Sequence, residues 1–206
     1  MNRRQKAVLI GMILGDAYLQ KTGESNARIR LEHSEKQKDY LLWKASLFPE
    51  YFPGKPSYLK RFNRHYDNSY RYIRWQSNAS PEIGKFRKIF YRNGKKIIPI
   101  NLVTLFIDPL SLAVWYMDDG YLYHRDKTIY IYLPEYLSTE QQLLLSTLKQ
   151  NFGLVPILKR KKTGSWVLIF PVQETRKLLS LMSHFIIPEM KFKLLDPVST
   201  ETSVSR

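Results

Sequence analysis

The segment LAVWYMDDGYLY, residues 112–123, runs six apolar residues into two adjacent aspartates, a glycine and two tyrosines. Asp-Asp-Gly is common turn chemistry, so an acidic turn after a buried helix is the simplest interpretation. A second segment, LIGMILGDA at residues 9–17, has the same form and lies in the other half of the chain. Two such segments predict a repeated unit, and the sequence around each supports that prediction.

The predicted elements follow the same order in both parts of the chain. In the first part they are an apolar helix (7–15), a strand hairpin (18–34), a helix from Ser34, a second strand pair (55–62 and 69–77), a helix from Pro81 and a closing segment, GKKIIP (94–99). In the second part they are a helix from about Pro109 to Asp119, a hairpin (121–133), a helix (138–152) opened by a capping box of Ser138 and Gln141, a second hairpin (155–170), a helix (172–185) and a closing segment (186–193). The sequence therefore predicts two homologous αββαββα halves, residues 1–103 and 104–206.

Net charge is the most informative feature of the composition. The 206 residues include 33 Lys and Arg against 18 Asp and Glu, a formal charge of +15. An excess of this size opposes compaction unless a polyanion neutralises it, which favours nucleic acid as the partner. An anionic membrane is the second candidate, but no basic amphipathic helix stands out and no apolar run approaches the ~20 residues of a membrane span. The lack of cysteine excludes disulfides and thiolate metal sites.

The predicted strands alternate between apolar and polar residues, as antiparallel strands with one solvent-facing side do. Arg28, Arg30 and Glu32 share one face of their strand, and Tyr130 and Tyr132 share one face of theirs. A charged outer face is often merely solvated. Several such strands in a strongly basic chain predict a surface that tracks DNA, with Arg reading guanine and Gln reading adenine.

Gly11 and Gly15 lie four residues apart on one face of the first apolar helix. A helix that is apolar all round must be buried, and small residues at this spacing let a second helix approach closely. If that partner is the helix before Asp119, then Asp16 and Asp119 end side by side. Each helix dipole opposes the charge there by about 0.3–1 kcal/mol, and the carboxylates repel each other. A cation would offset this cost, and oxygen ligands favour Mg²⁺, with Mn²⁺ or Ca²⁺ as substitutes.

These two segments resemble the paired signature helices of the LAGLIDADG homing endonucleases. The resemblance is to the single-chain, two-motif members encoded in introns, particularly those of fungal mitochondria. It runs from about residue 7 to residue 200 and includes KKIIPINL (95–102) and IIPEMKFKLL (186–195). Ala17 stands where the signature has Gly. Val114 stands where a small residue is usual, which raises the question of how closely the helices approach at that level.

The resemblance implies an α+β fold of two pseudo-symmetric αββαββα halves, with antiparallel, saddle-shaped DNA-binding sheets and the signature helices at the central interface. It also implies a monomeric, site-specific endonuclease that hydrolyses one phosphodiester per strand across the minor groove with a divalent metal and leaves short 3′ overhangs. By register, Asp16 and Asp119 are its catalytic metal ligands. Asp118 points about 100° away around the helix, so we expect it to be a hydrogen-bonded group at the helix interface.

A basic residue near each scissile phosphate is a further implication of the resemblance. GKKIIP offers Lys96, with Lys95 as the alternative, and MKFKL offers Lys193, with Lys191 as the alternative. A lysine there would stabilise the charge of the phosphorane or polarise the attacking water. A loop lysine that only reaches solvent is an equally simple interpretation of each.

The outward strand residues and adjoining turns are the predicted DNA contacts. Because the two halves carry different side chains there, the target should be asymmetric. The predicted contacts are Tyr18, Gln20, Lys21, Arg28, Arg30, Glu32, Lys60, Arg61, Arg71, Tyr72, Arg74 and Gln76 in the first half, and Tyr121, Tyr123, Arg125, Lys127, Tyr130, Tyr132, Lys159, Lys161 and Lys162 in the second.

Two other functions remain open for a chain with this resemblance. An RNA maturase that assists splicing of its host group I intron would use the same basic surface, with the intron RNA as partner. A catalytically inactive DNA-binding protein of the same fold would be expected to have lost one of the two carboxylates. The basic and then apolar N-terminus lacks a small-residue cleavage site, so it is interpreted as a core helix, not a leader. We therefore expect an organelle-encoded mitochondrial protein, or a cytoplasmic one if the source is prokaryotic.

Overall fold

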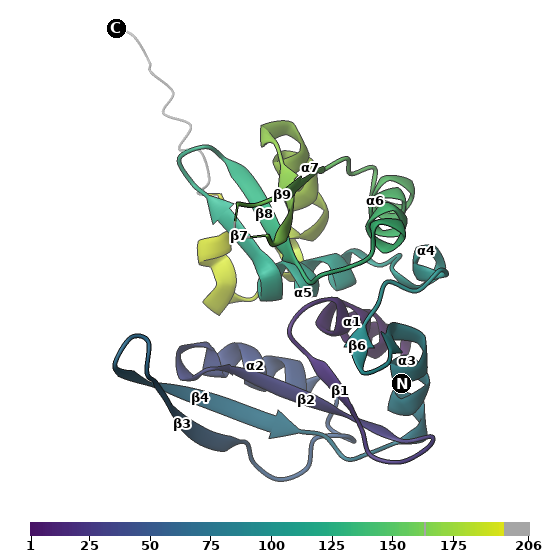
Figure 1. The fold of residues 1–206 in the computed structure, drawn as a ribbon, viewed down its shortest axis with the longest axis vertical. Helices are drawn as coiled ribbons and strands as arrows, with labels where there is room; N and C mark the ends of the chain where they lie inside the picture. Colours follow the sequence, from purple (N-terminus) through teal and green to yellow (C-terminus); the bar gives the residue numbers. More distant parts are fainter. Residues whose placement is uncertain (163, 196–206) are drawn as a thin grey trace, which may run out of the picture.

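A computed structural model describes residues 1–162 and 164–195 (Figure 1). The first half contains α1 (Arg3–Leu14), β1 (Tyr18–Lys21), β2 (Ala27–Ser34), a 3₁₀ turn (Glu35–Gln37), α2 (Lys38–Ser46), β3 (Ser57–Asn63), β4 (Asn68–Gln76) and α3 (Pro81–Phe90). A short β5–β6 pair (Tyr91–Arg92 and Lys95–Lys96) and α4 (Leu102–Leu105) lead into the second half. That half contains α5 (Pro109–Asp119), β7 (Gly120–Tyr123), β8 (Thr128–Leu133), α6 (Ser138–Phe152), β9 (Ile157–Arg160), β10 (Trp166–Phe170), α7 (Val172–Met182) and two 3₁₀ turns (Ser183–Phe185 and Pro188–Lys193). The repeated αββαββα order is confirmed.

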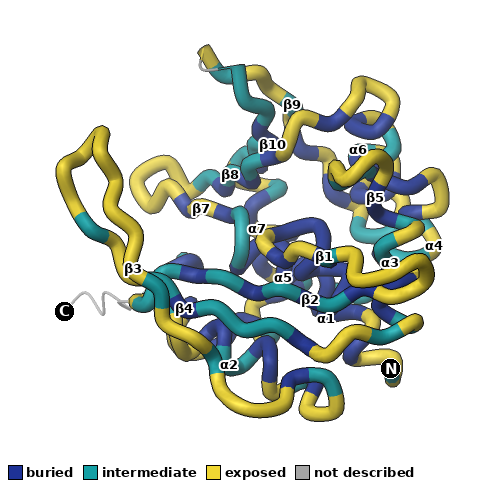
Figure 2. The backbone as a smooth tube through the Cα atoms, turned by 60° about the horizontal axis from the view of Figure 1, so that its bottom comes forward, coloured by how far each residue is buried: buried dark blue, intermediate teal, exposed yellow. Residues whose placement is uncertain are grey.

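Each half contains one antiparallel four-stranded sheet. The strand order is β1-β2-β4-β3 in the first half and β7-β8-β10-β9 in the second, so the two topologies are equivalent. Successive residues of β2 alternate between buried and half-buried, which leaves one side of the sheet facing solvent. The β3–β4 hairpin is largely exposed and projects beyond the body of the protein (Figure 2).

The central helices α1 and α5 lie between the two sheets (Figure 1). Residues 7–15 of the first helix segment and 110–117 of the second are buried without interruption, as apolar helices surrounded by protein should be. Pro109 occupies the first turn of α5, and Asp108 caps it by accepting a hydrogen bond from the Leu110 N–H at 3.0 Å. Within the described residues, none of the helices has the length and hydropathy needed to cross a bilayer.

Two predicted helix starts are wrong, each because of capping or strand geometry. The first helix begins at Arg3 instead of Ala7, because Asn2 accepts from the Gln5 N–H at 2.9 Å and Gln5 returns the contact. The helix predicted from Ser34 begins later, because Ser34 still belongs to β2 and a 3₁₀ turn precedes α2.

The predicted capping box of Ser138 and Gln141 is also wrong, because Ser138 is already the first helical residue. The reciprocal contact comes from Glu140, whose carboxylate accepts from the Leu137 N–H at 2.8 Å. Gln141 instead donates its side-chain amide to the Tyr136 carbonyl at 3.2 Å. The helix therefore begins where predicted but with different hydrogen bonds at its first turn.

Candidate active site at the ends of α1 and α5

Close packing of α1 against α5 depends on two glycines. A Cβ at Gly11 would lie 2.4 Å from the Ser111 carbonyl oxygen, and one at Gly15 would lie 2.4 Å from Asp118 Oδ2. The same Cβ at Gly11 would lie 2.8 Å from the Val114 Cβ, so Val114 is accommodated because it faces a glycine. The two helices therefore approach closely along their length, and Asp16 and Asp119 follow at their C-terminal ends.

Both of these carboxyl groups are held in surroundings that oppose their ionisation. Burial, together with the charges of Asp16 and Asp118, raises the pKa of Asp119 to about 8. Partial burial and Asp118 also raise the pKa of Asp16, although 45% of its side-chain surface is exposed. Both causes, desolvation and like charge, would be relieved by a divalent cation. The donor set thus fits a hard cation such as Mg²⁺.

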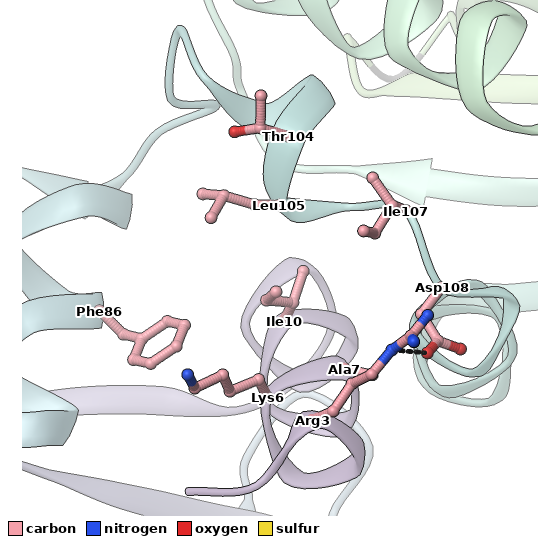
Figure 3. Close-up of a pocket in the computed structure, with 9 residues that line it drawn as sticks. All are labelled: Arg3, Lys6, Ala7, Ile10, Phe86, Thr104, Leu105, Ile107 and Asp108. Carbon is pink, nitrogen blue, oxygen red and sulfur yellow. Dashed lines mark ion pairs between the residues drawn. The ribbon is translucent and has the colours of Figure 1, made fainter.

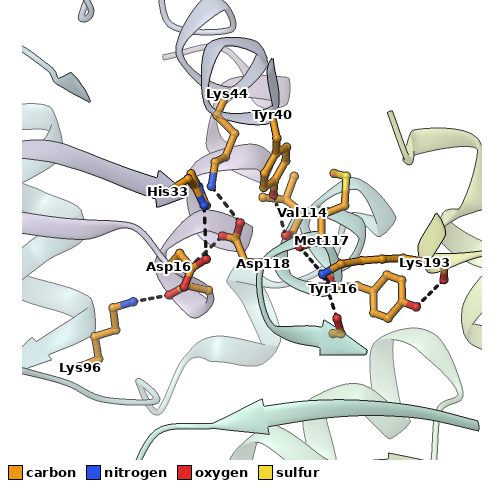
Figure 4. Close-up of polar contacts among 12 residues, drawn as sticks. Asp16, His33, Tyr40, Lys44, Lys96, Val114, Tyr116, Met117, Asp118 and Lys193 are labelled. Carbon is orange, nitrogen blue, oxygen red and sulfur yellow. Dashed lines mark hydrogen bonds and ion pairs between the residues drawn. The ribbon is translucent and has the colours of Figure 1, made fainter. Parts of the chain in front are cut away.

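Asp118 joins the two halves through polar contacts with Asp16 and Lys44 (Figure 4). Its Oδ2 accepts the backbone N–H of Asp16 at 3.0 Å, and its Oδ1 lies 2.8 Å from Lys44 Nζ. Both partners of this ion pair have 0% exposed side-chain surface. Lys44 also lies over the ring of Tyr40, at 4.3 Å from its centre, and Tyr40 donates to the Val114 carbonyl at 3.2 Å. The expected interface role of Asp118 is confirmed, and its cross-half partner is Lys44.

Two lysines cap the helix ends. Lys96 donates to the Gly15 carbonyl at the end of α1, and Lys193 donates to the carbonyls of Met117 and Gly120 at 2.6 and 2.8 Å. Burial lowers the pKa of both lysines, while the nearby carboxylates oppose that shift. The alternatives considered for these positions, residues 95 and 191, are exposed. The structure therefore brings one lysine from each half to the two aspartates.

His33 is a site residue that the sequence analysis missed. Its imidazole is buried and its Nδ1 lies 3.7 Å from Asp16 Oδ2 (Figure 4). Burial and the charge of Lys44 lower the pKa of His33 to about 3, so the ring is neutral at ordinary pH and the contact is not an ion pair. Ligand atoms of Asp16, His33 and Asp118 all lie within 4.8 Å of one another. Because Asp118 is already neutralised by Lys44, only the first two face the site with donor atoms to offer.

The outer face of the first sheet carries most of the contacts predicted there. Strand register places nine of the predicted residues on this face: Tyr18, Gln20, Arg28, Arg30, Glu32, Arg61, Tyr72, Arg74 and Gln76. Lys21, Lys60 and Arg71 fall on the opposite, helix-side face. Lys21 pairs with Ala27, which faces that side. Lys60 pairs with Arg71, which lies two residues before Ile73 on the same strand and therefore faces the same side as Ile73. The predicted basic surface thus contains fewer residues than the sequence suggested. Hydrogen bonds join several of its side chains to one another.

The second sheet has an aromatic outer face. Register places Tyr121, Tyr123, Tyr130 and Tyr132 on it, along with Lys159. Lys161 follows β9 and donates to the Tyr132 hydroxyl at 2.9 Å, which lowers the pKa of that phenol. The predicted contacts Arg125 and Lys127 lie in the exposed β7–β8 turn, and Lys162 is exposed after β9. The two sheets therefore present chemically different surfaces.

A groove of about 320 Å³ lies at the other end of the central helices, where both begin (Figure 3). Its lining is mainly apolar and includes Ile10, Phe86 and Leu105. The one carboxylate in the lining, Asp108, is already the cap of α5 and lies 4.0 Å from Arg3 Nε. The groove offers no pair of acids that could hold a metal, so the candidate chemistry belongs to the C-terminal ends of the helices.

Comparisons with known proteins agree with this fold. A model of the LAGLIDADG DNA endonuclease family matches residues 6–178. The chain is 31% identical over 200 residues to "Probable intron-encoded endonuclease 1" of Wickerhamomyces canadensis, covering 95% of this chain and 85% of that protein. It is 23% identical to the cytochrome b mRNA maturase bI2 of Debaryomyces hansenii, covering 94% and 74%. A solved structure of the homing endonuclease I-WcaI bound to its DNA recognition sequence matches with a TM-score of 0.86 and 30% identity, covering 95% and 88%.

Proposed function

Because the chain belongs to the LAGLIDADG DNA endonuclease family, we propose that it is a homing endonuclease that cuts both strands of a long, asymmetric DNA target. The observation that carries the proposal is the pair of carboxyl groups at the ends of α1 and α5, of which Asp119 has its pKa raised to about 8 beside Asp16. Such a pair is costly without a cation and matches metal-assisted phosphodiester hydrolysis. The expected products are short 3′ overhangs from cleavage across the minor groove.

We assign the metal ligands as Asp16 and Asp119, with Mg²⁺ as the cofactor and Mn²⁺ or Ca²⁺ as substitutes. When bound, a divalent cation supplies Lewis-acid stabilisation of phosphoryl charge. Lys96 and Lys193 are held at the helix ends by backbone carbonyls. Lys96 keeps donors for a phosphoryl oxygen as charge develops there, whereas Lys193 Nζ already donates to three carbonyls and would act through its positive charge. Their lowered pKa also suits them to exchange a proton with the attacking water or the leaving oxygen.

Recognition would come from the outer faces of the two sheets lying in the major groove. Arginine on the first sheet suits guanine, whereas tyrosine and lysine on the second suit apolar base edges and phosphates. Since both carboxylates come from one chain, a monomer is sufficient for double-strand cleavage. The predicted boundary between residues 103 and 104 lies inside α4, which connects the halves.

We also propose that the gene is organelle-encoded and the protein mitochondrial. Similarity to an intron-encoded endonuclease and to a cytochrome b mRNA maturase, both of yeasts, supports this origin. Expression of the chain with its organellar sequence context, followed by fractionation, would test the location.

The activity is tested with a plasmid library that carries random inserts, incubated with Mg²⁺ and, separately, with Ca²⁺. We expect the wild type to select and cut one family of long sites with Mg²⁺. Asp16→Asn and Asp119→Asn should each abolish double-strand cleavage and retain specific binding, because they keep shape and remove a metal ligand. Asp39→Asn, at an exposed position of α2, is the matched control and should cut normally. Retained cleavage in both site variants contradicts the assignment of metal ligands.

A maturase function is the second candidate, and the relative from Debaryomyces hansenii favours it specifically. Both functions would use basic surfaces, so they differ in substrate and in their need for the carboxylates. A splicing assay with the host intron, run beside a cleavage assay on the intronless allele, separates them. A maturase should splice equally well with Asp119→Asn.

A further inference from the structure

Glu32 lies on the outer face of the first sheet, where arginines from three adjacent strands converge on it. Arg74 on β4 places both Nε and Nη2 at 2.6 Å from Oε2. Arg30 on β2 approaches Oε2 at 3.2 Å, and Arg61 on β3 approaches Oε1 at 2.6 Å. These three side chains form the arginine cluster, and Glu32 is the group that joins its members.

We propose that Glu32 is a positioning residue that holds the arginine cluster as one pre-formed reading group, instead of contacting a base itself. This inference rests on the proposed function, because it requires that the outer face of the first sheet meets DNA. It deepens that function by assigning sequence discrimination in one half-site to a cluster and not to independent side chains.

The geometry leaves Glu32 little capacity to bind a base directly. A carboxylate oxygen accepts along about two lone-pair directions, and three arginine nitrogens already approach Oε2 while a fourth approaches Oε1. Only one acceptor direction, on Oε1, is left for a base. Partial burial alone would raise the pKa of Glu32, but hydrogen bonds from Arg61, Arg74 and Arg30 lower it to about 2. The carboxylate is therefore charged in any binding buffer.

The arginine cluster, by contrast, keeps donors for DNA. Its side chains remain 32%, 47% and 23% exposed for Arg30, Arg61 and Arg74. A guanidinium has five N–H groups in a rigid fork, so one or two contacts to Glu32 leave others available for guanine O6 and N7. Arg61 is fixed a second time because its guanidinium lies over the ring of Tyr72, at 4.9 Å from the centre. Side chains already ordered before binding lose less conformational entropy when they meet DNA.

Charge separates this role from that of a simple phosphate contact. Removing Glu32 would add one net positive charge to the face and free three long side chains. Non-specific affinity should then be unchanged or stronger, since it depends on net charge. Discrimination between base pairs should weaken, because flexible arginines can satisfy several sequences. Weaker discrimination together with unchanged or stronger non-specific affinity is therefore the result expected of a positioning residue and not of a phosphate contact.

The test compares wild type, Glu32→Gln and Glu35→Gln on random-sequence duplex DNA, selected by binding in the absence of divalent metal, so that the DNA is not cut, and then sequenced. Glu35→Gln is the matched control, because it removes one carboxylate from the same region, 3.8 Å from Arg71 and away from the arginine cluster. We expect Glu32→Gln to lose roughly tenfold discrimination at each of several neighbouring base pairs, with non-specific affinity unchanged or higher. Glu35→Gln should leave the base preferences of the wild type intact.

Two results would overturn the inference while leaving the proposed function in place. One is a wild-type preference that Glu32→Gln does not alter, and the other is a change confined to a single C·G position, as expected of a direct cytosine contact. A wild type without any sequence preference would overturn the proposed function itself. Arginine Nε–Hε signals in NMR provide a second measurement without DNA: those of the arginine cluster should shift and broaden in Glu32→Gln, and Glu32→Asp should partly restore them. Unchanged signals in Glu32→Gln would also overturn the inference.

Discussion

Replacing Lys44 by methionine removes the charge opposite Asp118 and keeps most of the side-chain volume. Both side chains have 0% exposed surface, and their charged atoms lie 2.8 Å apart. At an effective dielectric constant of ~20 their Coulomb attraction is about 6 kcal/mol, much of which offsets the desolvation of the two charges. Loss of one partner leaves the other buried and unpaired. We therefore expect Lys44→Met to lower the free energy of unfolding by about 3–5 kcal/mol at neutral pH.

This cost should depend on pH through Asp118. Burial raises the pKa of Asp118, but the charge of Lys44 and the hydrogen bonds from Lys44 and the Asp16 N–H outweigh it and bring the pKa below its ordinary value. Without Lys44, burial dominates, and the folded pKa rises above that of the unfolded chain. The folded variant then holds a proton that the unfolded variant has released. The difference in free energy of unfolding between the wild type and Lys44→Met should therefore shrink by up to about 1.4 kcal/mol for each pH unit below the new pKa.

Urea unfolding followed by tryptophan fluorescence at about pH 5 and about pH 8 measures both effects. Lys177→Met is the control, because Lys177 makes a 2.6 Å ion pair with Glu174 while 57% exposed; its effect should stay below about 0.5 kcal/mol. Adding Asp118→Asn to Lys44→Met should remove the part of the pH dependence that comes from Asp118 and recover part of the free energy of unfolding, since the unpaired buried charge is gone. A Lys44→Met effect as small as that of the control at both pH values would refute the reasoning.

Three further results are expected. Gly11→Ala should lower the free energy of unfolding by about 1–3 kcal/mol or more, because the new Cβ would lie 2.4 Å from the Ser111 carbonyl oxygen; a urea titration that shows no change would contradict the close approach. Asp119 has its pKa raised from 3.8 to about 8, so in metal-free protein the free energy of unfolding should fall as pH rises between those values, and Ca²⁺ should raise the Tm more at about pH 8 than at about pH 6. An equal Ca²⁺ response at both would count against this. Arg74→Ala should relax preference at one or two base pairs, whereas Lys162→Ala should weaken binding of all sequences and flatten the salt dependence; binding profiles measured at several salt concentrations distinguish these outcomes.

Local signals explain why much of the fold could be predicted from the sequence. Each of these signals depends only on residues close together in the sequence. They are the alternation in the strands, Pro109 at a helix start and the apolar runs before Asp16 and Asp119. The same alternation also predicts the position of His33, because the parity that directs Ile29 and Leu31 inward directs His33 inward as well. That position brings a neutral imidazole to Asp16.

Other parts of the site depend on contacts between distant segments. Helical spacing places Lys44 on the apolar face of α2, four residues after Tyr40 and four before Phe48. Its partner could not be predicted, because Asp118 lies in the other half and meets Lys44 only when α2 packs on the central helices. Lys60 and Arg71 were predicted to face DNA because they are basic, but the register of β3 against β4 assigns them to the helix side. Glu32 was identified correctly as an outer-face residue, while its partners depend on how three strands align.

The facing of Gly15 and Asp118 has a consequence for how halves of such chains can be recombined. The residue before the terminal aspartate is glycine in α1 and aspartate in α5, and a side chain at the first would collide with the second. A chimaera made of two first halves would leave Lys44 without a carboxylate, and one made of two second halves would oppose two buried aspartates in the absence of Lys44. The two halves are thus complementary at this interface and not interchangeable. Exchange of a half between relatives should preserve function only when Gly15, Lys44 and Asp118 are matched across the new junction.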